Sequence, residues 1–405
     1  MSASPSGAQK RSFTVKRLRN PAFQRHNWPR ELLRTYQKYR MPIPQELLSF
    51  VGDQTGEGLL SGASTGGGGK LEQPSRADVS GVGLVAATPV NEDAEYVSPI
   101  KVGGQTINVA LDSGSADLWV FSSRLPASDL VGHQAYNSSQ SSSFRSLPGA
   151  NFSILYADAT SASGDVGTDT VDVGGATVTS QAVGMATSVS SAFAEDTNLS
   201  GLLGLAFSQL STIKPTKQKT FFENVMPSLA EPVFTADLRK DAAGAFEFGR
   251  IDGSKFVGAL SWAPVNTSSG FWQVSTRGFA VGNTQTSLPA ADAIVDTGTT
   301  IMLVSEEISD GYYSQVPGAQ LTPAAAGMTF PCNATLPDLL VDVDGVYTAR
   351  VKGTDINFGP LNSTECFGGI QRTTNKLQVW GDVFIRSQFV VFHGGNQSLG
   401  LAPHV

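Results

Sequence analysis

The amino-acid sequence predicts an all-β protein, and three observations support this fold class. Only 16% of the 405 residues are charged, whereas glycine accounts for 43 of them, as expected for a chain with many turns. Val, Ile, Phe and Thr fall in short alternating runs such as 167–173 and 389–392, which is the pattern of half-buried strands. Long helical periodicity is rare after residue 80. At this length the chain has room for two domains.

One short motif occurs twice, once in each half of the chain. The copy around Asp112 reads Val-Ala-Leu-Asp-Ser-Gly-Ser, and the copy around Asp296 reads Ala-Ile-Val-Asp-Thr-Gly-Thr. Further along, each half has a glycine behind an apolar pair, Gly204 and Gly381. A glycine in that position lets another backbone segment pass close to it. The repeat suggests that each half delivers one aspartate to a shared site.

Two carboxylates held together have a chemistry that a single one lacks. An ionised carboxylate after an apolar strand is costly to desolvate unless its proton is shared. Two carboxylates about 3 Å apart cannot both ionise, so one acts as a base and the other as an acid. We therefore expect Asp112 and Asp296 to activate a water molecule without a metal ion or another cofactor. The shared proton belongs to the pair.

Several motifs, in order and at family-like separations, resemble those of a known family. From about Val82 onwards the chain is similar to the pepsin-type aspartic endopeptidases, and most similar to the fungal penicillopepsin and aspergillopepsin type. The resemblance implies a bilobal fold, with lobes related by a pseudo-twofold axis and a central cleft, and a secreted acid endopeptidase. The motifs are Asp112-Ser-Gly-Ser-Ala-Asp-Leu-Trp-Val-Phe, Tyr156-Ala-Asp, Gly201-Leu-Leu-Gly-Leu-Ala-Phe, Asp296-Thr-Gly-Thr-Thr, Cys366-Phe-Gly-Gly-Ile-Gln and Leu399-Gly-Leu-Ala-Pro.

The resemblance assigns supporting roles to the residues that follow each aspartate. In each copy, the first hydroxyl residue matches one that links the two loops through backbone groups. The glycine amide can donate to the carboxylate and favour its ionisation. The second hydroxyl residue matches one that orients the outer carboxylate oxygen. These residues are Ser113, Gly114, Ser115, Thr297, Gly298 and Thr299.

The segment around Tyr156 is similar to the flap hairpin that closes over bound substrate in this family. The resemblance implies that Tyr156 caps the cleft and hydrogen-bonds Trp119, although a core tyrosine and a core tryptophan would also fit the pattern. Ala157 and Ala159 replace glycines that are typical of the branch. If those positions need a positive φ, the alanines stiffen the flap, so the substrate range or the rate is expected to change.

Five further residues are candidates for substrate binding. In the fungal branch, an acidic residue at the position of Asp158, with a hydroxyl residue at that of Thr160, allows lysine just before the scissile bond. We expect such tolerance beside the usual preference for large apolar residues, with a solvated turn aspartate as the alternative. Phe193, Leu202 and Ile301 match residues of apolar subsites, and core packing is the alternative for each.

Residues 1–77 have the properties of a propeptide. They hold 12 Lys and Arg against 5 Asp and Glu, whereas the remainder holds 16 against 30. A basic head favours binding to the acidic body of the same chain over nucleic acid. Lys38 and Tyr39, in a plausibly helical stretch, match the pair with which family propeptides block the catalytic carboxylates; ordinary residues on a solvated helix face are the alternative. Residues 61–69 predict a mobile linker, and we expect maturation between Lys70 and Val85.

The two cysteines and the glycosylation sequons favour a secreted protein. Cys332 and Cys366 match cysteines that pair in the related fungal enzymes, and two free buried thiols are the alternative. No stretch is apolar enough to span a bilayer, and the first residues lack the apolar core of a signal peptide, so we expect the natural signal to be missing from this chain. The seven sequons begin at Asn137, Asn151, Asn198, Asn266, Asn333, Asn362 and Asn396.

The predicted organisation is a head (1–77), an N-terminal catalytic lobe (78–256) and a C-terminal catalytic lobe (257–405). We expect a monomer that acts on protein and peptide substrates, with its own propeptide as an intramolecular inhibitor and with no membrane partner. One alternative is a catalytically inactive pepsin-like binding protein, but such relatives usually lose an aspartate or the flap tyrosine. Another is a carboxylate-pair glycosidase, whose acids are not embedded in duplicated Asp-hydroxyl-Gly loops.

Overall fold

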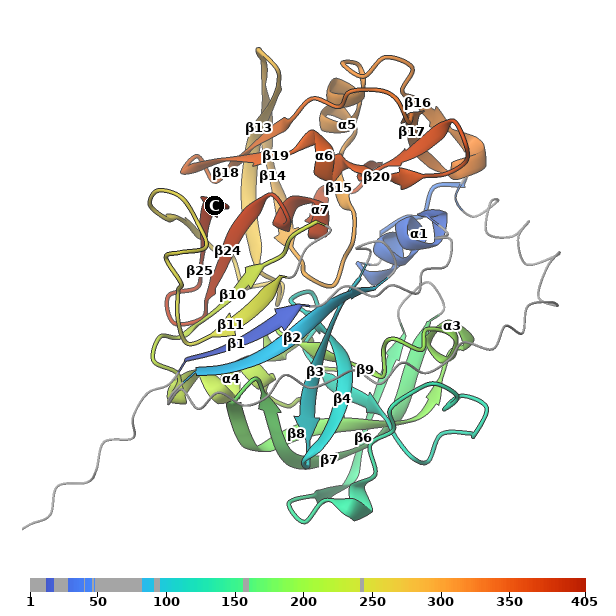
Figure 1. Cartoon of the computed structure of the whole chain (residues 1–405), viewed down its shortest axis with the longest axis vertical. Coiled ribbons are helices and arrows are strands. Elements are labelled where there is room, and N and C mark those ends of the chain that lie inside the picture. The colour runs from blue at the N-terminus through green and yellow to red at the C-terminus, as the bar shows by residue number, and fades with distance from the viewer. Residues whose placement is uncertain are drawn as a thin grey trace, which may run out of the picture.

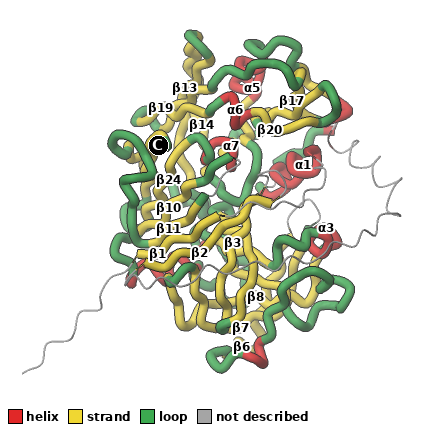
Figure 2. The backbone as a smooth tube through the Cα atoms, viewed as in Figure 1, coloured by secondary structure: helices red, strands yellow, loops and turns green. Residues whose placement is uncertain are grey.

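The structure is a computed structural model that describes residues 12–17, 28–39, 41–45, 47, 82–90, 95–155, 160–240 and 244–405. Strands dominate both lobes, and helices are short and lie at their margins (Figure 2). The all-β fold class is therefore confirmed. In Figure 1 the N-terminal lobe lies below, the C-terminal lobe above, and a sheet with strands from both ends of the chain joins them.

The lower lobe is built from strands between residues 95 and 204. In the hydrogen-bonding order of the sheet, β3 is followed by β4, β9, β5, β8, β7 and β6. In β7, buried residues alternate with partly exposed ones, as expected for a strand with one face towards solvent. All residues of β5 and β9 are buried, as expected for strands at the centre of a core. The strands are β3 (Glu95–Val102), β4 (Gln105–Asp112), β5 (Leu118–Phe121), β6 (Arg145–Leu155), β7 (Ser161–Val173), β8 (Ala176–Val189) and β9 (Gly201–Gly204).

The upper lobe repeats this construction with two sheets. The larger has the order β19-β18-β13-β14-β23-β15-β22, and the smaller has the order β16-β17-β21-β20. The strands are β13 (Gln273–Val281), β14 (Thr284–Val295), β15 (Met302–Ser305), β16 (Gln320–Thr322), β17 (Gly327–Pro331), β18 (Leu339–Val343), β19 (Tyr347–Val351), β20 (Asn357–Pro360), β21 (Glu365–Gly368), β22 (Ile370–Thr373) and β23 (Leu377–Trp380).

The central sheet combines strands from distant parts of the sequence. Its order is β12-β25-β24-β10-β11-β1-β2-β3, so the head strand β1 lies between β11 and β2 (Figure 1). Strand β1 is antiparallel to β11 and parallel to β2. The strands are β1 (Ser12–Arg17), β2 (Val82–Val90), β10 (Val233–Asp237), β11 (Ala245–Phe248), β12 (Ser261–Pro264), β24 (Gln388–His393) and β25 (Ser398–Pro403).

The longest helix belongs to the head, where the sequence predicts helix, and the others are short connectors. Helix α4 begins with a capping box in which Thr220 and Glu223 satisfy each other's backbone amides. The helices are α1 (Trp28–Lys38), α3 (Ser191–Glu195), α4 (Phe221–Val225), α5 (Glu306–Tyr313), α6 (Gly353–Ile356) and α7 (Asp382–Ile385), with 3₁₀ turns η1 (Ser138–Gln140), η2 (Ser208–Leu210), η3 (Met226–Ser228) and η4 (Pro323–Ala325).

Aromatic side chains fill the junction beneath the central sheet. Trp272 is fully buried, and its ring packs against Phe234 and Phe392, which stack on each other with ring centroids 4.4 Å apart. Its indole nitrogen donates to the Leu205 carbonyl of the other lobe. The lobes are therefore joined by a packed core as well as by the chain.

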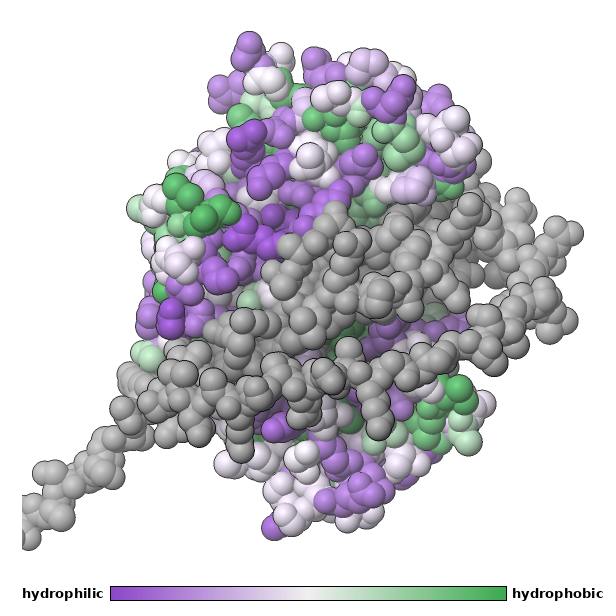
Figure 3. All heavy atoms as spheres, viewed as in Figure 1, coloured by the Kyte–Doolittle hydropathy of each residue, from purple (hydrophilic) through white to green (hydrophobic). Residues whose placement is uncertain are grey.

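On the surface, hydrophilic and neutral side chains predominate, and the apolar ones form small separate patches on the visible face (Figure 3).

Cys332 and Cys366 form a disulfide across a sequence separation of 34 residues, which confirms the predicted pairing. Replacing both cysteines with serine is expected to lower the free energy of unfolding by about 3–4 kcal/mol, because the open chain regains loop entropy when unfolded. Urea titration at neutral pH, with and without a reducing agent, checks this value. Equal midpoints for the reduced wild type and the double variant are the control, and equal midpoints without reduction would contradict the expectation.

Candidate active site

Each aspartate lies where a central strand of its lobe ends. Strand β4 ends at Asp112, which pairs in parallel with Gly204 of β9, and Asp296 follows directly after β14, whose last residue pairs in parallel with Trp380 of β23. A Cβ atom added at Gly381 would lie 2.1 Å from the carbonyl oxygen of Thr299, so only glycine lets these segments meet. The duplicated motif thus produces duplicated geometry, as the sequence predicts.

Hydrogen bonds cross between the two loops at their bases. The Ser113 amide donates to Thr297 Oγ1 at 3.0 Å, and the Thr297 amide donates to Ser113 Oγ at 2.9 Å. Each hydroxyl also donates to the other lobe's backbone, Ser113 to the Val295 carbonyl and Thr297 to that of Leu111. The loops therefore hold each other, and serine at position 113 makes the same bonds as threonine at 297.

The two carboxylates receive matching sets of donors. Asp112 accepts from the Gly114 amide at 2.8 Å and from Ser115 Oγ at 2.6 Å. Asp296 accepts from the Gly298 amide at 2.9 Å and from the Thr299 hydroxyl. Both aspartates are fully buried. This arrangement favours ionisation of the pair and fixes the rotation of each carboxylate.

The glycine of each loop lies against the aspartate of the other loop. A Cβ atom added at Gly298 would lie 2.2 Å from Asp112 Oδ1, so a larger residue would push the carboxylates apart. The spacing of the two half-sites therefore depends on the absence of a side chain at this point.

Lys38, near the end of α1, lies between the two carboxylates. Its Nζ atom is 2.7 Å from Asp112 Oδ1 and 2.8 Å from Asp296 Oδ2. The next residue, Tyr39, donates its hydroxyl to Asp296 Oδ2 at 2.5 Å. One atom of the head thus contacts both carboxylates, at the pair of positions that the sequence predicts.

These contacts shift the pKa values of the groups involved. Burial pushes the pKa of Asp296 upwards, but the Lys38 ammonium and the hydrogen bonds that it accepts lower it to about 2. Burial raises the pKa of Asp112, and the nearby Asp296 charge adds to this rise while Lys38 opposes it. Burial disfavours the charge of Lys38, but the two carboxylates outweigh it and raise its pKa. Lys38 therefore stays protonated whenever it lies here.

Helix α1 packs against the C-terminal lobe through an apolar face. Leu32, Leu33 and Tyr36 are buried, and the Tyr36 hydroxyl donates to the Arg372 carbonyl at 2.5 Å. Met41 contacts Thr373, which lies on β22 together with Arg372. Tyr36 was not among the predicted contact residues. The apolar spacing of residues 32, 33 and 36 marks one face of a helix and was the pattern that could have indicated this contact.

The predicted flap is described only in part. Tyr156, Ala157, Asp158 and Ala159 lie outside the described residues, and so does the expected bond between Tyr156 and Trp119. The strands that lead into and out of this segment, β6 and β7, form an antiparallel hairpin in which Leu155 pairs with Ser161. Thr160 is buried at its end. The described strands on either side of the predicted flap therefore pair as a hairpin.

The remaining predicted subsite residues are buried, and they lie in different places. Leu202 lines a small cavity together with Thr297 and Gly298, which places it beside the carboxylates. Phe193 packs edge-on against Trp119, with ring centroids 5.1 Å apart. Ile301 is fully buried, and its carbonyl accepts from the Gly381 amide. All three residues belong to buried apolar clusters, and Leu202 also lines the cavity described above.

The described residues also bear on metal and membrane binding. In this part of the chain, no three His, Cys, Asp or Glu side chains are grouped so that they could hold a metal ion. Within the same residues, no helix has the length and apolar character needed to cross a membrane.

Comparison with known proteins gives matches along nearly the whole chain. The family model for eukaryotic aspartyl protease matches residues 95–404. An aspergillopepsin A-like aspartic endopeptidase of Aspergillus fumigatus is 43% identical, over 98% of this chain and 93% of its own. Endothiapepsin of Cryphonectria parasitica is 42% identical, over 99% and 92%. Penicillopepsin-3 of Penicillium janthinellum is 44% identical, over 82% and 84%. The matches to the first two relatives cover nearly the whole chain and so include the head as well as the lobes.

Proposed function

Because the chain belongs to the eukaryotic aspartyl protease family, we propose that Asp112 and Asp296 act together as the catalytic pair of an acid endopeptidase. The observation that carries this proposal is that both carboxylates lie within hydrogen-bond distance of one atom, Lys38 Nζ. A water molecule in that place, once the head has left, would contact both carboxylates in the same way. That is the position from which a shared nucleophile can be activated.

In the proposed reaction, one carboxylate takes a proton from the water as it attacks the peptide carbonyl. The other carboxylate protonates the leaving nitrogen, so the pair ends the cycle with the same number of protons. The crossing bonds of Ser113 and Thr297 keep the carboxylates at a fixed separation. Ser115 holds the Asp112 oxygen that lies away from Lys38 Nζ, and Thr299 holds Asp296 Oδ2, the oxygen that Lys38 Nζ contacts, so each hydroxyl fixes the orientation of its own carboxylate.

The full chain, exposed to pH 3–5 and mixed with an unfolded protein, tests the proposed activity. We expect new fragments that arise from internal bonds, together with a shortened N-terminus of the enzyme itself. Intact substrate over this pH range, with the head removed, would reject an endopeptidase and favour the inactive binding protein.

We propose that the head keeps the enzyme inactive until acid releases it. The side chains of Lys38, Tyr39 and Tyr36 occupy the place where a substrate would need to lie. Secretion is part of the same proposal, since a disulfide and accessible Asn-X-Ser/Thr sequons suit an extracellular protein.

The proposed substrate preference is for large apolar residues around the scissile bond, with lysine accepted just before it. Peptides that differ only at that position should be cleaved with Leu or Lys but poorly with Glu. Asp158→Asn is expected to lower kcat/KM for the Lys peptide by about tenfold and to leave the Leu peptide within about twofold, because one ion pair is lost. Refusal of Lys by the wild type, or an equal loss for both peptides, would contradict this assignment.

A further inference from the structure

A cavity of about 360 Å³ lies in the N-terminal lobe, at the base of the hairpin formed by β6 and β7. This volume is within the range of small-molecule sites. Among the described residues, its lining includes neither carboxylate of the active site and no residue of the head. The residues that line it are Arg124, Ser138, Phe144, Ser146, Leu147, Pro148, Gly149, Ala150, Asp165, Val166 and Met185.

The cavity exists because β6 bulges away from β7. Ser146 pairs with Gly167 and Asn151 pairs with Asp165, so residues 147–150 stand opposite Val166 alone. The bulge contains Pro148, Gly149 and Ala150, whose side chains are too small to fill the space that it opens. Strand β6 then continues into the segment that carries Tyr156. The hollow is therefore part of the strand geometry.

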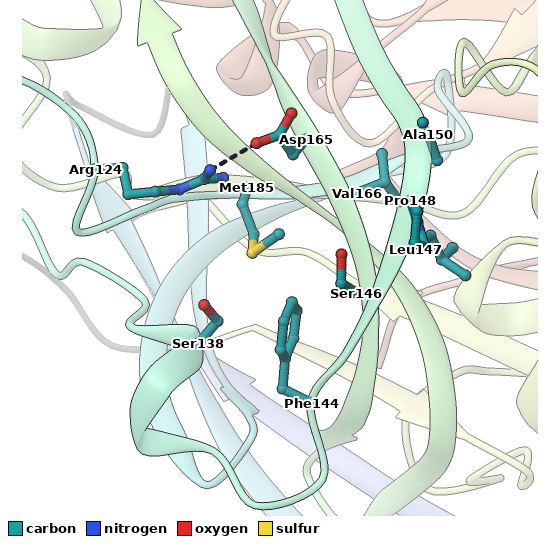
Figure 4. A pocket seen from close by; sticks show the side chains of 11 residues that line it. Arg124, Ser138, Phe144, Ser146, Leu147, Pro148, Ala150, Asp165, Val166 and Met185 are labelled. Carbon is teal, nitrogen blue, oxygen red and sulfur yellow. Dashed lines mark hydrogen bonds and ion pairs between the residues drawn. The ribbon is translucent and has the colours of Figure 1, made fainter.

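The cavity has an apolar floor and a charged rim. In Figure 4, the Arg124–Asp165 pair lies at one end and the Phe144 ring at the other, with the Met185 thioether between them. Val166 and Met185 are buried. Arg124 Nη1 donates to Asp165 Oδ2 at 2.6 Å, and the two side chains are 48% and 61% exposed. An ion pair this exposed is weak, and a guanidinium has further N–H donors to offer.

A basic loop lies directly against the bulge. The Lys214 amide donates to the Asn151 carbonyl at 2.9 Å, and the Asn151 amide donates to the Lys214 carbonyl at 3.0 Å. Lys214, Lys217 and Lys219 are exposed, and none of them forms an ion pair within the described part of the chain. The loop that pairs with β6 beside the bulge therefore carries three positive charges, although the body of the protein is acidic.

We propose that this cavity binds a small ligand in which one large apolar group adjoins a free carboxylate. The apolar group would occupy the space over Val166 and Met185, and the carboxylate would accept from Arg124. Peptide products that end in a large apolar residue have this chemistry, and so do short fatty acids. The peptide source rests on the proposed endopeptidase activity, whereas the binding itself does not.

Isothermal titration of the full chain at pH 6.5 tests the proposal without requiring catalysis. The probes are N-acetyl-phenylalanine, its uncharged amide and octanoate. We expect N-acetyl-phenylalanine to bind at least about tenfold more tightly than the amide, because only the acid forms a charged hydrogen bond. Tighter binding of octanoate, with the same response to the variants below, would support the site and assign it to lipid.

Variants of the rim and of the floor decide where the probe binds. Arg124→Gln is expected to weaken binding of N-acetyl-phenylalanine about tenfold, and Asp165→Asn to strengthen it, since the guanidinium then has no competing carboxylate. Ala150→Phe should abolish binding by filling the cavity. The matched control is Arg350→Gln, which breaks an exposed arginine–aspartate pair in the other lobe. Equal affinities for acid and amide, no binding of either acid, or equal effects of the Arg124 and Arg350 variants would overturn the proposal.

Discussion

Asp296→Asn is expected to lower kcat by at least about a thousandfold, the scale on which proton transfer by positioned side chains contributes to hydrolysis. Asparagine has nearly the shape of aspartate and can still accept from Gly298 and Thr299. It cannot ionise, however, so the pair can no longer hold one proton between two carboxylates. Asp112→Asn should have a similar effect, because neither carboxylate can be both acid and base on its own.

The measurement is the steady-state hydrolysis of a fluorogenic peptide at pH 4. Both variants need a specific protease site inserted in residues 61–69, so that the head is removed without self-processing. Asp292→Asn, an exposed change on β14, the strand that leads to Asp296, is the matched control and should leave kcat within about twofold. A tenfold or smaller loss in both active-site variants would show that the hydrolysis does not depend on this pair.

Lys38→Ala is expected to accelerate release of the head at pH 5 by about tenfold or more, and to make release less dependent on pH. The Lys38 charge lowers the pKa of Asp296 and opposes the rise in that of Asp112. When the head leaves, Asp296 loses the Lys38 charge and its pKa rises towards the ordinary value, so at this residue the released state binds more protons than the docked state. Acid therefore favours release.

The pH window follows from the value for Asp296. Its docked pKa of about 2 lies below the ordinary value of 3.8, so its contribution to docking is full above about pH 4 and is lost as the pH falls towards 2. The Lys38 ammonium is protonated in both states and adds no pH dependence of its own. In Lys38→Ala this contribution is missing at every pH, and the dyad can take up its shared proton while the head is still present.

The time course of head cleavage at pH 3, 4, 5 and 6, followed by gel and by N-terminal sequencing, checks this prediction. Arg34→Ala is the control, because it removes the same charge from the same helix without touching either aspartate. If the two variants behave alike, the general attraction between head and body controls release. If Lys38→Ala keeps the wild-type rate and pH profile, the contacts of Lys38 do not limit activation.

The sequence was sufficient for the parts of the site that short motifs encode. Asp112 and Asp296 were predicted because the same motif follows an apolar strand in each half of the chain, and the roles of their hydroxyl neighbours came from the family resemblance. The pairing of Cys332 with Cys366 came from family resemblance and is confirmed. By contrast, the Tyr36 contact with Arg372 joins residues that are 336 positions apart, and no local pattern specifies its partner.

The cavity in the N-terminal lobe was also beyond the reach of sequence reasoning. Pro148 and Gly149 indicate an irregularity in β6, but a turn and a bulge use the same residues. Only the pairing of Asn151 with Asp165 shows how many residues are left out of the ladder. The position of β1 in the central sheet is similar, because a six-residue strand can pair with any free edge.

The support of Asp296 by Trp380 has a consequence for the order of events during synthesis. The Asp296 amide donates to the Trp380 carbonyl at 3.1 Å, and Gly381 donates to the Ile301 carbonyl. The second half-site therefore cannot be completed until the residues around Trp380 have left the ribosome. Lys38 is translated long before either aspartate. A nascent chain thus contains Lys38 before it can assemble the pair of aspartates, and no stage of translation presents both aspartates without this lysine.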